Sequence, residues 1–407
     1  MNAAKIAIGA ALLVALLAAV MVSVQFRNSQ ATGATSFGPG KSVRDLKRMP
    51  DSAGLDGQDA GAEGTGGQGQ SEPGSLPSSS TVETLPQFPA EFAESTRELR
   101  PLDVQREALL QIMSEYFSLD TDVVQKLAGI FNNSPYLGQG LPKVTEHPMS
   151  RAQCLKVRAP LGVLDSDAAA CGAKNMSRVY ARSRGEMAST ANLCVDRFEF
   201  PNIPCEYPLT WVRSSAAAQI CEVLGKRLCD AHEWEGACAG DLRPPEEEYF
   251  FGKPRLQAEY LSNQRRELVW SYGSVKNHAL CGTGALKSPE CFASGVKCGS
   301  NTFPAGSFPE CKSAFDVYDL HGNAAEHMNL PLESKQLTSR GGSGRTEMKG
   351  SWFIFQQKEA HPDDCRWRAK NWHGSDVDDP HSHHNYHLGF RCCKTLGKSS
   401  DANPAKR

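Results

Sequence analysis

Residues 316–326 read DVYDLHGNAAE, a glycine-containing turn sequence with an acidic residue at each end. This stretch is the middle one of five short motifs. The first is NLCVDRFEFPN at 192–202. The second spans residues 218–238 and consists of AQIC, GKRL, EWE and a final cysteine. The last two are GSW at 350–352 and LGFRC at 388–392. Around these motifs the apolar runs are short, glycine and proline are frequent, and long periodic helices are scarce. This texture is typical of a domain with a small core and much irregular structure.

Two short helices are predicted within and beside the second motif. The first covers residues 214–224, and Gly225 is suited to its C-cap. The second begins at Asp230, where Glu233 three residues later completes a capping-box pattern, and it ends at Gly240.

The five motifs, in this order, resemble those of the formylglycine-generating enzyme family, also called sulfatase-modifying factors. Any one motif alone would be a weak signal, whereas the shared order is specific. The resemblance implies that residues 150–396 form an α+β domain related to C-type lectins, linked by disulfides. Function does not follow from this fold alone.

The resemblance also implies two disulfides, Cys221–Cys392 and Cys238–Cys365, because the family joins the same elements. Cys221 lies on the apolar face of its predicted helix, which supports the first pair. The alternative is that the neighbouring Cys393 makes this bridge, since adjacent strand residues point to opposite faces and only one can reach the helix. Each native disulfide in such a domain is worth roughly 2–5 kcal/mol.

The enzyme of this family oxidises a substrate cysteine with a copper(I) ion held by two thiolates. The resemblance places the first thiolate at Ile354 and the second near Lys358 or Glu359, and no cysteine occurs from 353 to 364. Isoleucine has no lone pair, and copper(I) prefers soft sulfur ligands. We therefore expect neither copper at a dithiolate site nor formylglycine-generating activity.

In the family, the turn at the centre of the 316–326 motif holds calcium through two side chains and two backbone carbonyls. The matching positions are Asp319, Gly322, Ala324 and Glu326. All four offer the hard oxygen ligands that calcium prefers. The alternative is a structural turn in which Asp319 accepts backbone N–H bonds and Glu326 forms a salt bridge.

Histidines gather before the closing motif. On a strand, His381 and His383 would share one face and His384 would lie on the other. Two or three imidazoles together with Asp363, Asp364 or Glu359 could hold zinc, iron or copper. The alternative is an exposed polar loop that is rich in histidine. The full set is His373, His381, His383, His384 and His387.

The cysteines indicate the compartment. All fourteen lie between Cys154 and Cys393, without the CxxC pairs that thiolate metal sites favour. An even number confined to one region predicts a disulfide framework in an oxidising compartment. The formal net charge of -2 gives no reason to expect binding to nucleic acid, which would need a basic face.

The N-terminus predicts a membrane anchor within residues 1–27. The apolar run 6–24 nearly spans a hydrocarbon core of about 30 Å. A cleaved signal peptide is the alternative, but residues 22–26, VSVQF, make a poor cleavage site. We therefore predict an uncleaved transmembrane helix, with the C-terminal domain outside the cytoplasm, in the periplasm or at the cell surface.

Three further segments complete the predicted domain organisation. Residues 28–90 form a Gly/Ser-rich linker, too polar to offset the entropy of ordering. Residues 91–149 carry two short helices, the second N-capped by Asp120, which pack on the main domain or, alternatively, into the groove of a partner. Residues 397–407 form a flexible tail.

The fold motifs are intact while the copper cysteines are missing. We therefore predict a non-catalytic binding or scaffolding module tethered in the cell envelope, with an envelope protein or ligand as its partner. The alternative is a metal-dependent oxidative enzyme that uses the histidines in place of the cysteines. A plain structural spacer would not need the aromatic C-terminal segment that carries Trp352, Trp367 and Trp372.

Overall fold

The computed structural model describes residues 82–83, 85–164, 166–291, 295, 297–370 and 374–397. The predicted anchor, most of the predicted linker and all but the first residue of the predicted tail lie outside these ranges. No helix among the described residues is long and apolar enough to cross a membrane. The folded unit begins within the predicted linker, because strand β1 (Val82–Glu83) pairs with β2 (Val163–Leu164).

Helices α7 (Ser214–Val223) and α8 (Ala231–Ala239) lie within one residue of their predicted ends. The capping box of α8 is present, since Glu233 accepts the backbone N–H of Asp230 at 2.9 Å and the Asp230 side chain accepts in return. Gly225 and Gly240 have φ angles of 67° and 74°, the left-handed conformation that ends many helices.

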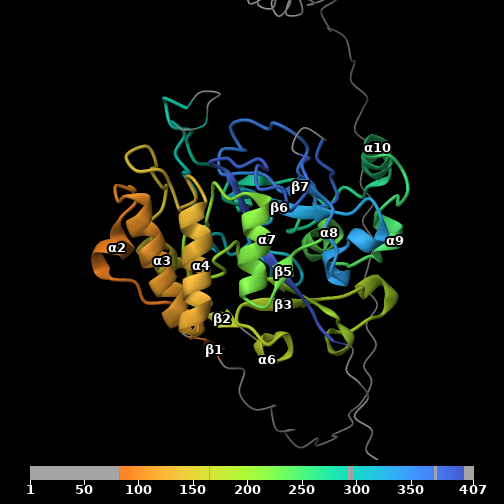
Figure 1. Ribbon diagram of the computed structural model, residues 1–407, viewed down its shortest axis with the longest axis horizontal. Coiled ribbons are helices and arrows are strands. Elements are labelled where there is room, and N and C mark those ends of the chain that lie inside the picture. Colours follow the sequence, from red (N-terminus) through yellow and green to blue (C-terminus); the bar gives the residue numbers. More distant parts are fainter. Residues whose placement is uncertain are drawn as a thin grey trace, which may run out of the picture. The chain divides into compact units, whose positions relative to one another are not determined.

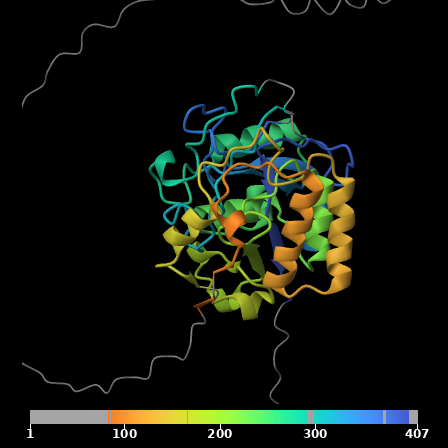
Figure 2. The ribbon, with the colours of Figure 1, turned by 90° about the vertical axis from the view of Figure 1, so that its left-hand side faces the viewer.

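Helices α3 (Leu102–Phe117) and α4 (Thr121–Asn133) occupy the predicted helical segment. Their apolar sides join the core formed with α7, through side chains such as Met113, Leu127 and Phe131. Figure 1 shows α3, α4 and α7 side by side, and the turned view in Figure 2 agrees. These helices therefore pack on the main domain, as predicted.

The strands within the described residues form three sheets. Their orders are β3–β4–β9–β5, β7–β6–β8 and β1–β2. The pair β6–β8 is parallel, and the other pairs are antiparallel. The bounds are β3 (Met176–Val179), β4 (Leu193–Asp196), β5 (Arg227–Leu228), β6 (Ala325–Leu330), β7 (Arg345–Lys349), β8 (Leu388–Phe390) and β9 (Cys392–Thr395).

The closing motif is not the single strand that the sequence predicts. β8 pairs with β6, whereas β9 pairs with β4 and β5, so the chain passes from one sheet to another at Arg391. Arg391 is fully buried at this crossing and donates to the Asp196 carbonyl at 3.0 Å. A five-residue motif carries no local signal for the sheet that each half joins, which explains the difference.

The other helices are short. Figure 1 shows α9 and α10 on the side of the domain away from α3 and α4. The bounds are α2 (Ala90–Glu94), α5 (Arg151–Arg158), α6 (Ala168–Cys171), α9 (Pro245–Glu248) and α10 (Arg255–Arg265), with 3-10 turns η1 (Arg182–Arg184), η2 (Ala188–Thr190), η3 (His278–Leu280), η4 (Ser334–Gln336) and η5 (Thr338–Arg340).

All fourteen cysteines form disulfides. The two pairs implied by the resemblance, Cys221–Cys392 and Cys238–Cys365, are present. Cys393 bonds Cys229, so the adjacent cysteines of β9 serve opposite faces of the strand. The remaining pairs are Cys154–Cys205, Cys171–Cys194, Cys281–Cys311 and Cys291–Cys298.

Candidate functional site

The segment after β7 places the expected copper position inside a hydrophobic cluster. Gly350 has a φ of 74°, and an added Cβ there would lie 3.0 Å from the Leu320 carbonyl oxygen. Four residues later, Ile354 is only 5% exposed and packs in the cluster that contains Phe353 and Tyr386. The side chain at this position therefore belongs to the core and offers no ligand atom.

No thiol is available elsewhere, because every cysteine of the chain is in a disulfide. At the second expected copper position, Lys358 and Glu359 are exposed, and Glu359 forms an ion pair with Lys276 at 2.6 Å. Copper(I) needs soft ligands such as thiolates. The residues present do not fit the dithiolate copper site of the family.

Tryptophan and histidine rings stack in pairs beside Ile354. The ring centroids of Trp352 and His387 are 4.6 Å apart, and those of His361 and Trp367 are 4.3 Å apart. We call these four residues the aromatic–histidine cluster. Within the described part of the chain, the indole Nε1 of Trp352 and the Nε2 of His361 are buried without a hydrogen-bond partner.

These two nitrogen atoms differ in chemistry. His361 Nδ1 donates to the Pro362 carbonyl at 2.7 Å, so the neutral imidazole leaves Nε2 as an acceptor. The indole of Trp352 can only donate. Buried polar atoms are normally paired, and the rings of Trp352 and His361 lie 5.4 Å apart. The cluster therefore holds an unpaired donor and an unpaired acceptor close together.

A buried polar network is centred on Asp363. Its carboxylate lies 3.1 Å from His278 Nε2, accepts the Ser351 hydroxyl at 3.1 Å and accepts Trp270 Nε1 at 3.2 Å. Burial alone would raise the pKa of Asp363, but the hydrogen bond from His278 and the charges of His321 and His278 hold this pKa below its usual value. The network therefore keeps the carboxylate ionised.

This network is not a nucleophilic triad. In a triad the hydroxyl bonds to an imidazole, which removes its proton. Here the Ser351 hydroxyl donates directly to Asp363 and accepts the Gly322 N–H at 2.9 Å. Ser351 therefore ties the turn at Gly322 to Asp363, and its hydroxyl has no imidazole base.

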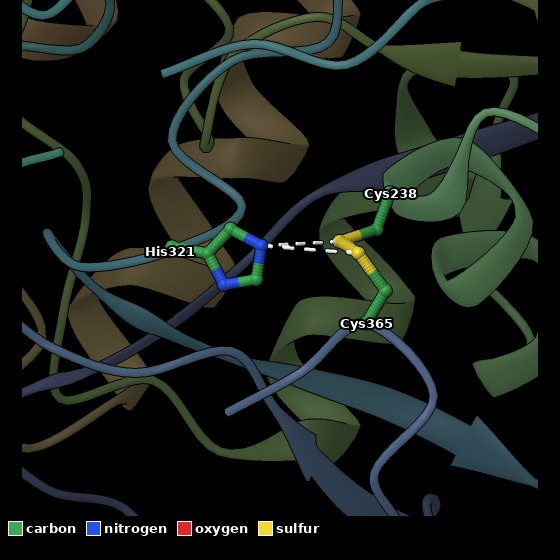
Figure 3. Close-up of side chains that lie close together, drawn as sticks. All are labelled: Cys238, His321 and Cys365. Atoms are coloured by element: carbon green, nitrogen blue, oxygen red, sulfur yellow. Dashed lines mark hydrogen bonds between the residues drawn. A yellow bond between two sulfur atoms is a disulfide. The ribbon is translucent and has the colours of Figure 1, made fainter. Parts of the chain in front are cut away.

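His321 contacts a disulfide, as Figure 3 shows. Its Nε2 lies 3.4 Å from Cys238 Sγ and 3.8 Å from Cys365 Sγ, and it accepts the Ser271 N–H at 3.0 Å. Burial lowers the pKa of His321 to about 4. Although two cysteines and a histidine suit a metal ion, the sulfur atoms are bonded to each other and are not thiolates, so this group is a packed disulfide.

The predicted calcium turn is buried, and its carboxylates have protein partners. Asp319 accepts the Gly306 N–H at 2.6 Å. Glu326 pairs with Arg391 at 2.6 and 2.7 Å and accepts the indole N–H of Trp234 at 3.1 Å. These contacts match the alternative to calcium binding, a structural turn in which Asp319 accepts a backbone N–H and Glu326 forms a salt bridge.

A third buried carboxylate, Glu199, joins this turn and was not singled out from the sequence. Glu199 accepts the Ala324 N–H at 2.7 Å and the Asn323 side chain at 2.5 Å. Burial raises the pKa of Glu199, and the charges of Asp319 and Glu326 raise it further. Burial likewise raises the pKa of Asp319 to about 6. For Glu199, the only signal in the sequence was its position within the 192–202 motif.

The donor set fits a divalent cation in charge and ligand type. Neither Glu199 nor Asp319 forms an ion pair within the described residues, and burial raises the pKa of both carboxyls, which favours their neutral forms when no cation is bound. Carboxylates have about four lone-pair sites each and keep capacity beyond the bonds above. Among the described residues these carboxylates do not all lie within 4.8 Å of one another, so an ion would also need the carbonyls of Gly322 and Ala324.

The histidines of the C-terminal segment are not brought together. His381 and His383 are exposed, His384 lies 3.3 Å from an Arg213 nitrogen, and His387 stacks on Trp352. His373 lies outside the described residues. Where the chain is described, no three of these imidazoles have ligand atoms within 4.8 Å of one another. The expected carboxylate partners pair elsewhere: Asp363 with His278, Asp364 with Arg266, and Glu359 with Lys276.

The fold and the site define a disulfide-rich α+β domain of the sulfatase-modifying factor type whose copper position lacks a thiol. The chain belongs to this family, since the model for the sulfatase-modifying factor enzyme 1-like domain matches residues 170–396. A solved structure, described as the crystal structure of CarF, is similar with 12% identity and a TM-score of 0.30, over 55% of this chain and 97% of that chain. No curated protein matches the chain.

Proposed function

We propose that the chain is a non-catalytic binding or scaffolding module of the cell envelope. The observation that carries this proposal is that Ile354 is buried where a copper thiolate is expected, while every cysteine is in a disulfide. Oxidation of a cysteine by this family's chemistry needs two thiolates on copper(I). This chain has no thiol to supply either one.

The aromatic–histidine cluster is the proposed binding place. Trp352 and Trp367 are only 8% and 5% exposed, so their rings are held rigidly in the core, with little side-chain entropy left to lose, and only a small part of each reaches solvent. A ligand that offers one acceptor and one donor would pair both Trp352 Nε1 and His361 Nε2. Large, rigid aromatic side chains of this kind dominate many binding sites.

The experiment incubates the full-length chain with a sulfatase-type cysteine peptide, with and without copper(I), and follows the peptide by mass spectrometry. We expect no conversion of cysteine to formylglycine. A formylglycine-generating member of the family serves as the positive control. Turnover by this chain above the enzyme-free background would contradict the proposal.

The alternative, a metal-dependent oxidative enzyme, is supported only by the residue types of the histidine segment. Metal analysis of the full-length chain, purified without chelators, separates the two functions. About one iron, copper or zinc ion per chain, lost in His383→Ala and His384→Ala, would favour the enzyme. A content far below one ion per chain would favour the binding module.

We also propose that calcium binds at Asp319, Gly322, Ala324 and Glu326 and stabilises the domain. The support is that three buried carboxyl groups, Glu199, Asp319 and Glu326, surround this turn, and among the described residues only Glu326 forms an ion pair. An ion that binds only the native state adds about 2.7 kcal/mol at a hundred times its Kd. We expect calcium to raise the melting temperature of the wild type, and Asp319→Asn to remove the effect. The exposed Asp122→Asn is the matched control, and unchanged melting at millimolar calcium would contradict this proposal.

The membrane tether is a proposal that rests on the apolar run 6–24, which lies outside the described residues. An uncleaved helix of this length keeps the protein in the membrane fraction. N-terminal sequencing of the mature protein is expected to find Met1 or the residue after it. A mature N-terminus near Gln25 in the membrane-free fraction would overturn the tether.

A further inference from the structure

A cavity of about 280 Å³ opens at the C-terminal end of α5. It could hold roughly nine water molecules at about 30 Å³ each. Its described lining is rich in cationic and aromatic side chains, and it shares no residue with the aromatic–histidine cluster. The lining residues that matter here are Arg158, Arg197, Phe198, Lys312, Asp316 and Tyr318.

Arg158 is the least expected of these side chains. It is only 2% exposed, and among the described residues no carboxylate forms an ion pair with it. Its terminal nitrogens donate to the Gly306 carbonyl at 2.9 Å and the Gly162 carbonyl at 3.5 Å, but its Nε is buried without a partner. Burial raises the pKa of the Asp319 carboxyl and the charge of Arg158 opposes this rise, but the two groups form no direct ion pair. A buried charge without a directly paired counter-charge is costly. The structure therefore holds a desolvated guanidinium with unused donor capacity beside an open space.

The other charged groups around the cavity add positive charge. Arg197 is 5% exposed, and its Nε donates to the Met176 carbonyl at 3.3 Å. Lys312 is half exposed and pairs with Asp316 at 2.6 Å. Three cations face one acid among the described lining residues, which favours an anionic ligand.

The walls of the cavity are fixed in place. The rings of Phe198 and Tyr318 stack at 5.2 Å, and the Arg158 guanidinium lies 5.2 and 4.7 Å from their centroids. Tyr318 N–H donates to the Arg197 carbonyl at 2.7 Å. At Gly306 an added Cβ would lie 2.8 Å from an Arg158 nitrogen, so only glycine allows this approach. A ligand would thus meet donors that are already oriented.

We propose that this cavity binds a small organic oxyanion, with a phosphate or sulfate monoester as the ligand class. The tetrahedral head accepts from Arg158, Arg197 and Lys312, since guanidinium groups match the geometry of such oxyanions. The volume exceeds that of an inorganic ion and leaves room for the organic group against Phe198. The proposal is independent of the function argued above, because it uses different residues.

The test titrates the full-length chain with phenyl phosphate, phenyl sulfate, inorganic phosphate and inorganic sulfate by calorimetry at constant ionic strength in sodium chloride. We expect the esters to bind more tightly than the inorganic ions. Lys312→Ala is expected to weaken binding about tenfold, because it removes one charge-assisted contact. Arg158→Gln is expected to abolish binding, with circular dichroism as the check on its fold.

Lys335→Ala is the matched control, because Lys335 is an exposed lysine paired with an acid at 2.8 Å, as Lys312 is, but does not line the cavity. Its affinity is expected to equal that of the wild type. Equal binding of ester and inorganic ion would assign the site to a free oxyanion and would still support the oxyanion chemistry. The proposal would be overturned if none of the four phosphate and sulfate compounds binds, or if the wild type and Lys312→Ala bind them equally well.

Discussion

At the scale of single residues, Ile354 shows how a catalytic position becomes part of a core. Its side chain packs with Phe353 and Phe355, both fully buried. Burying an isoleucine side chain is worth roughly 1.5–3 kcal/mol, and a thiolate in the same surroundings would be costly to desolvate. The resemblance to the family identified this loss of a ligand from the sequence, because the loss depends on residue type. The other neighbours that fill the space, such as Trp211 and Tyr386, belong to distant segments and came only from the structure.

The pH dependence of stability is a second residue-scale consequence, and His147 gives the clearest case. His147 is buried, stacks on Tyr207 at 3.6 Å, and lies 2.9 Å from the Thr302 carbonyl. Burial lowers its pKa from 6.5 to about 3, while the hydrogen bond to Thr302 opposes this shift. The native state therefore excludes a proton that the unfolded chain binds below about pH 6.5.

We accordingly predict that the free energy of unfolding falls as the pH drops from about 6.5 towards 3. This one group contributes up to about 1.4 kcal/mol per pH unit in that window. His147→Gln keeps a donor for the Thr302 carbonyl but does not titrate, so urea unfolding should show a shallower pH slope. The exposed His381→Gln should keep the wild-type slope, and equal slopes for all three proteins would refute the prediction.

At the scale of elements, periodicity and capping predicted the helices well. The ends of α7 and α8 were correct to within one residue because Gly225, Asp230, Glu233 and Gly240 act locally. The closing strand was not predicted correctly. Its division at Arg391 depends on pairing with β6 on one side and β4 on the other, which are distant in sequence.

The packing of α3 and α4 on α7 leads to a prediction at this scale. Phe131 of α4 is fully buried in the core that contains Ile220 of α7. Phe131→Ala should lower the free energy of unfolding by about 3–5 kcal/mol, through lost transfer energy and a residual cavity. Val104 of α3 is 42% exposed, so Val104→Ala should change the free energy of unfolding by no more than about 0.5 kcal/mol.

Urea unfolding followed by tryptophan fluorescence measures this change, because the buried tryptophans Trp211, Trp234, Trp352 and Trp367 lie in other core clusters than Phe131. If α3 and α4 belong to the cooperative unit, Phe131→Ala shifts the fluorescence transition. A Phe131→Ala protein with the wild-type fluorescence midpoint would mean that the two helices unfold separately.

At the scale of the whole molecule, the candidate site joins segments that no local pattern connects. Asp363 meets His278, 85 positions earlier, and Glu199 meets Asn323, 124 positions later. The sequence marked Asp319 and Glu326 only through the resemblance to a family. The carboxylate that completes their group had no pattern of its own, because nothing local distinguishes a buried Glu199 from an exposed one.

The disulfides provide the last prediction. Cys221–Cys392 closes a loop with a sequence separation of 171, whereas Cys291–Cys298 has a separation of 7. In the chain-entropy model the longer loop contributes about 5 kcal/mol and the shorter about 2 kcal/mol. The Cys221→Ala/Cys392→Ala protein should therefore lose at least twice as much free energy of unfolding as Cys291→Ala/Cys298→Ala. Urea unfolding under non-reducing conditions measures both, with peptide mapping to verify that the other six bridges are retained. Equal losses would show that local packing of the sulfur atoms, rather than restriction of the unfolded chain, governs the contribution of these bridges.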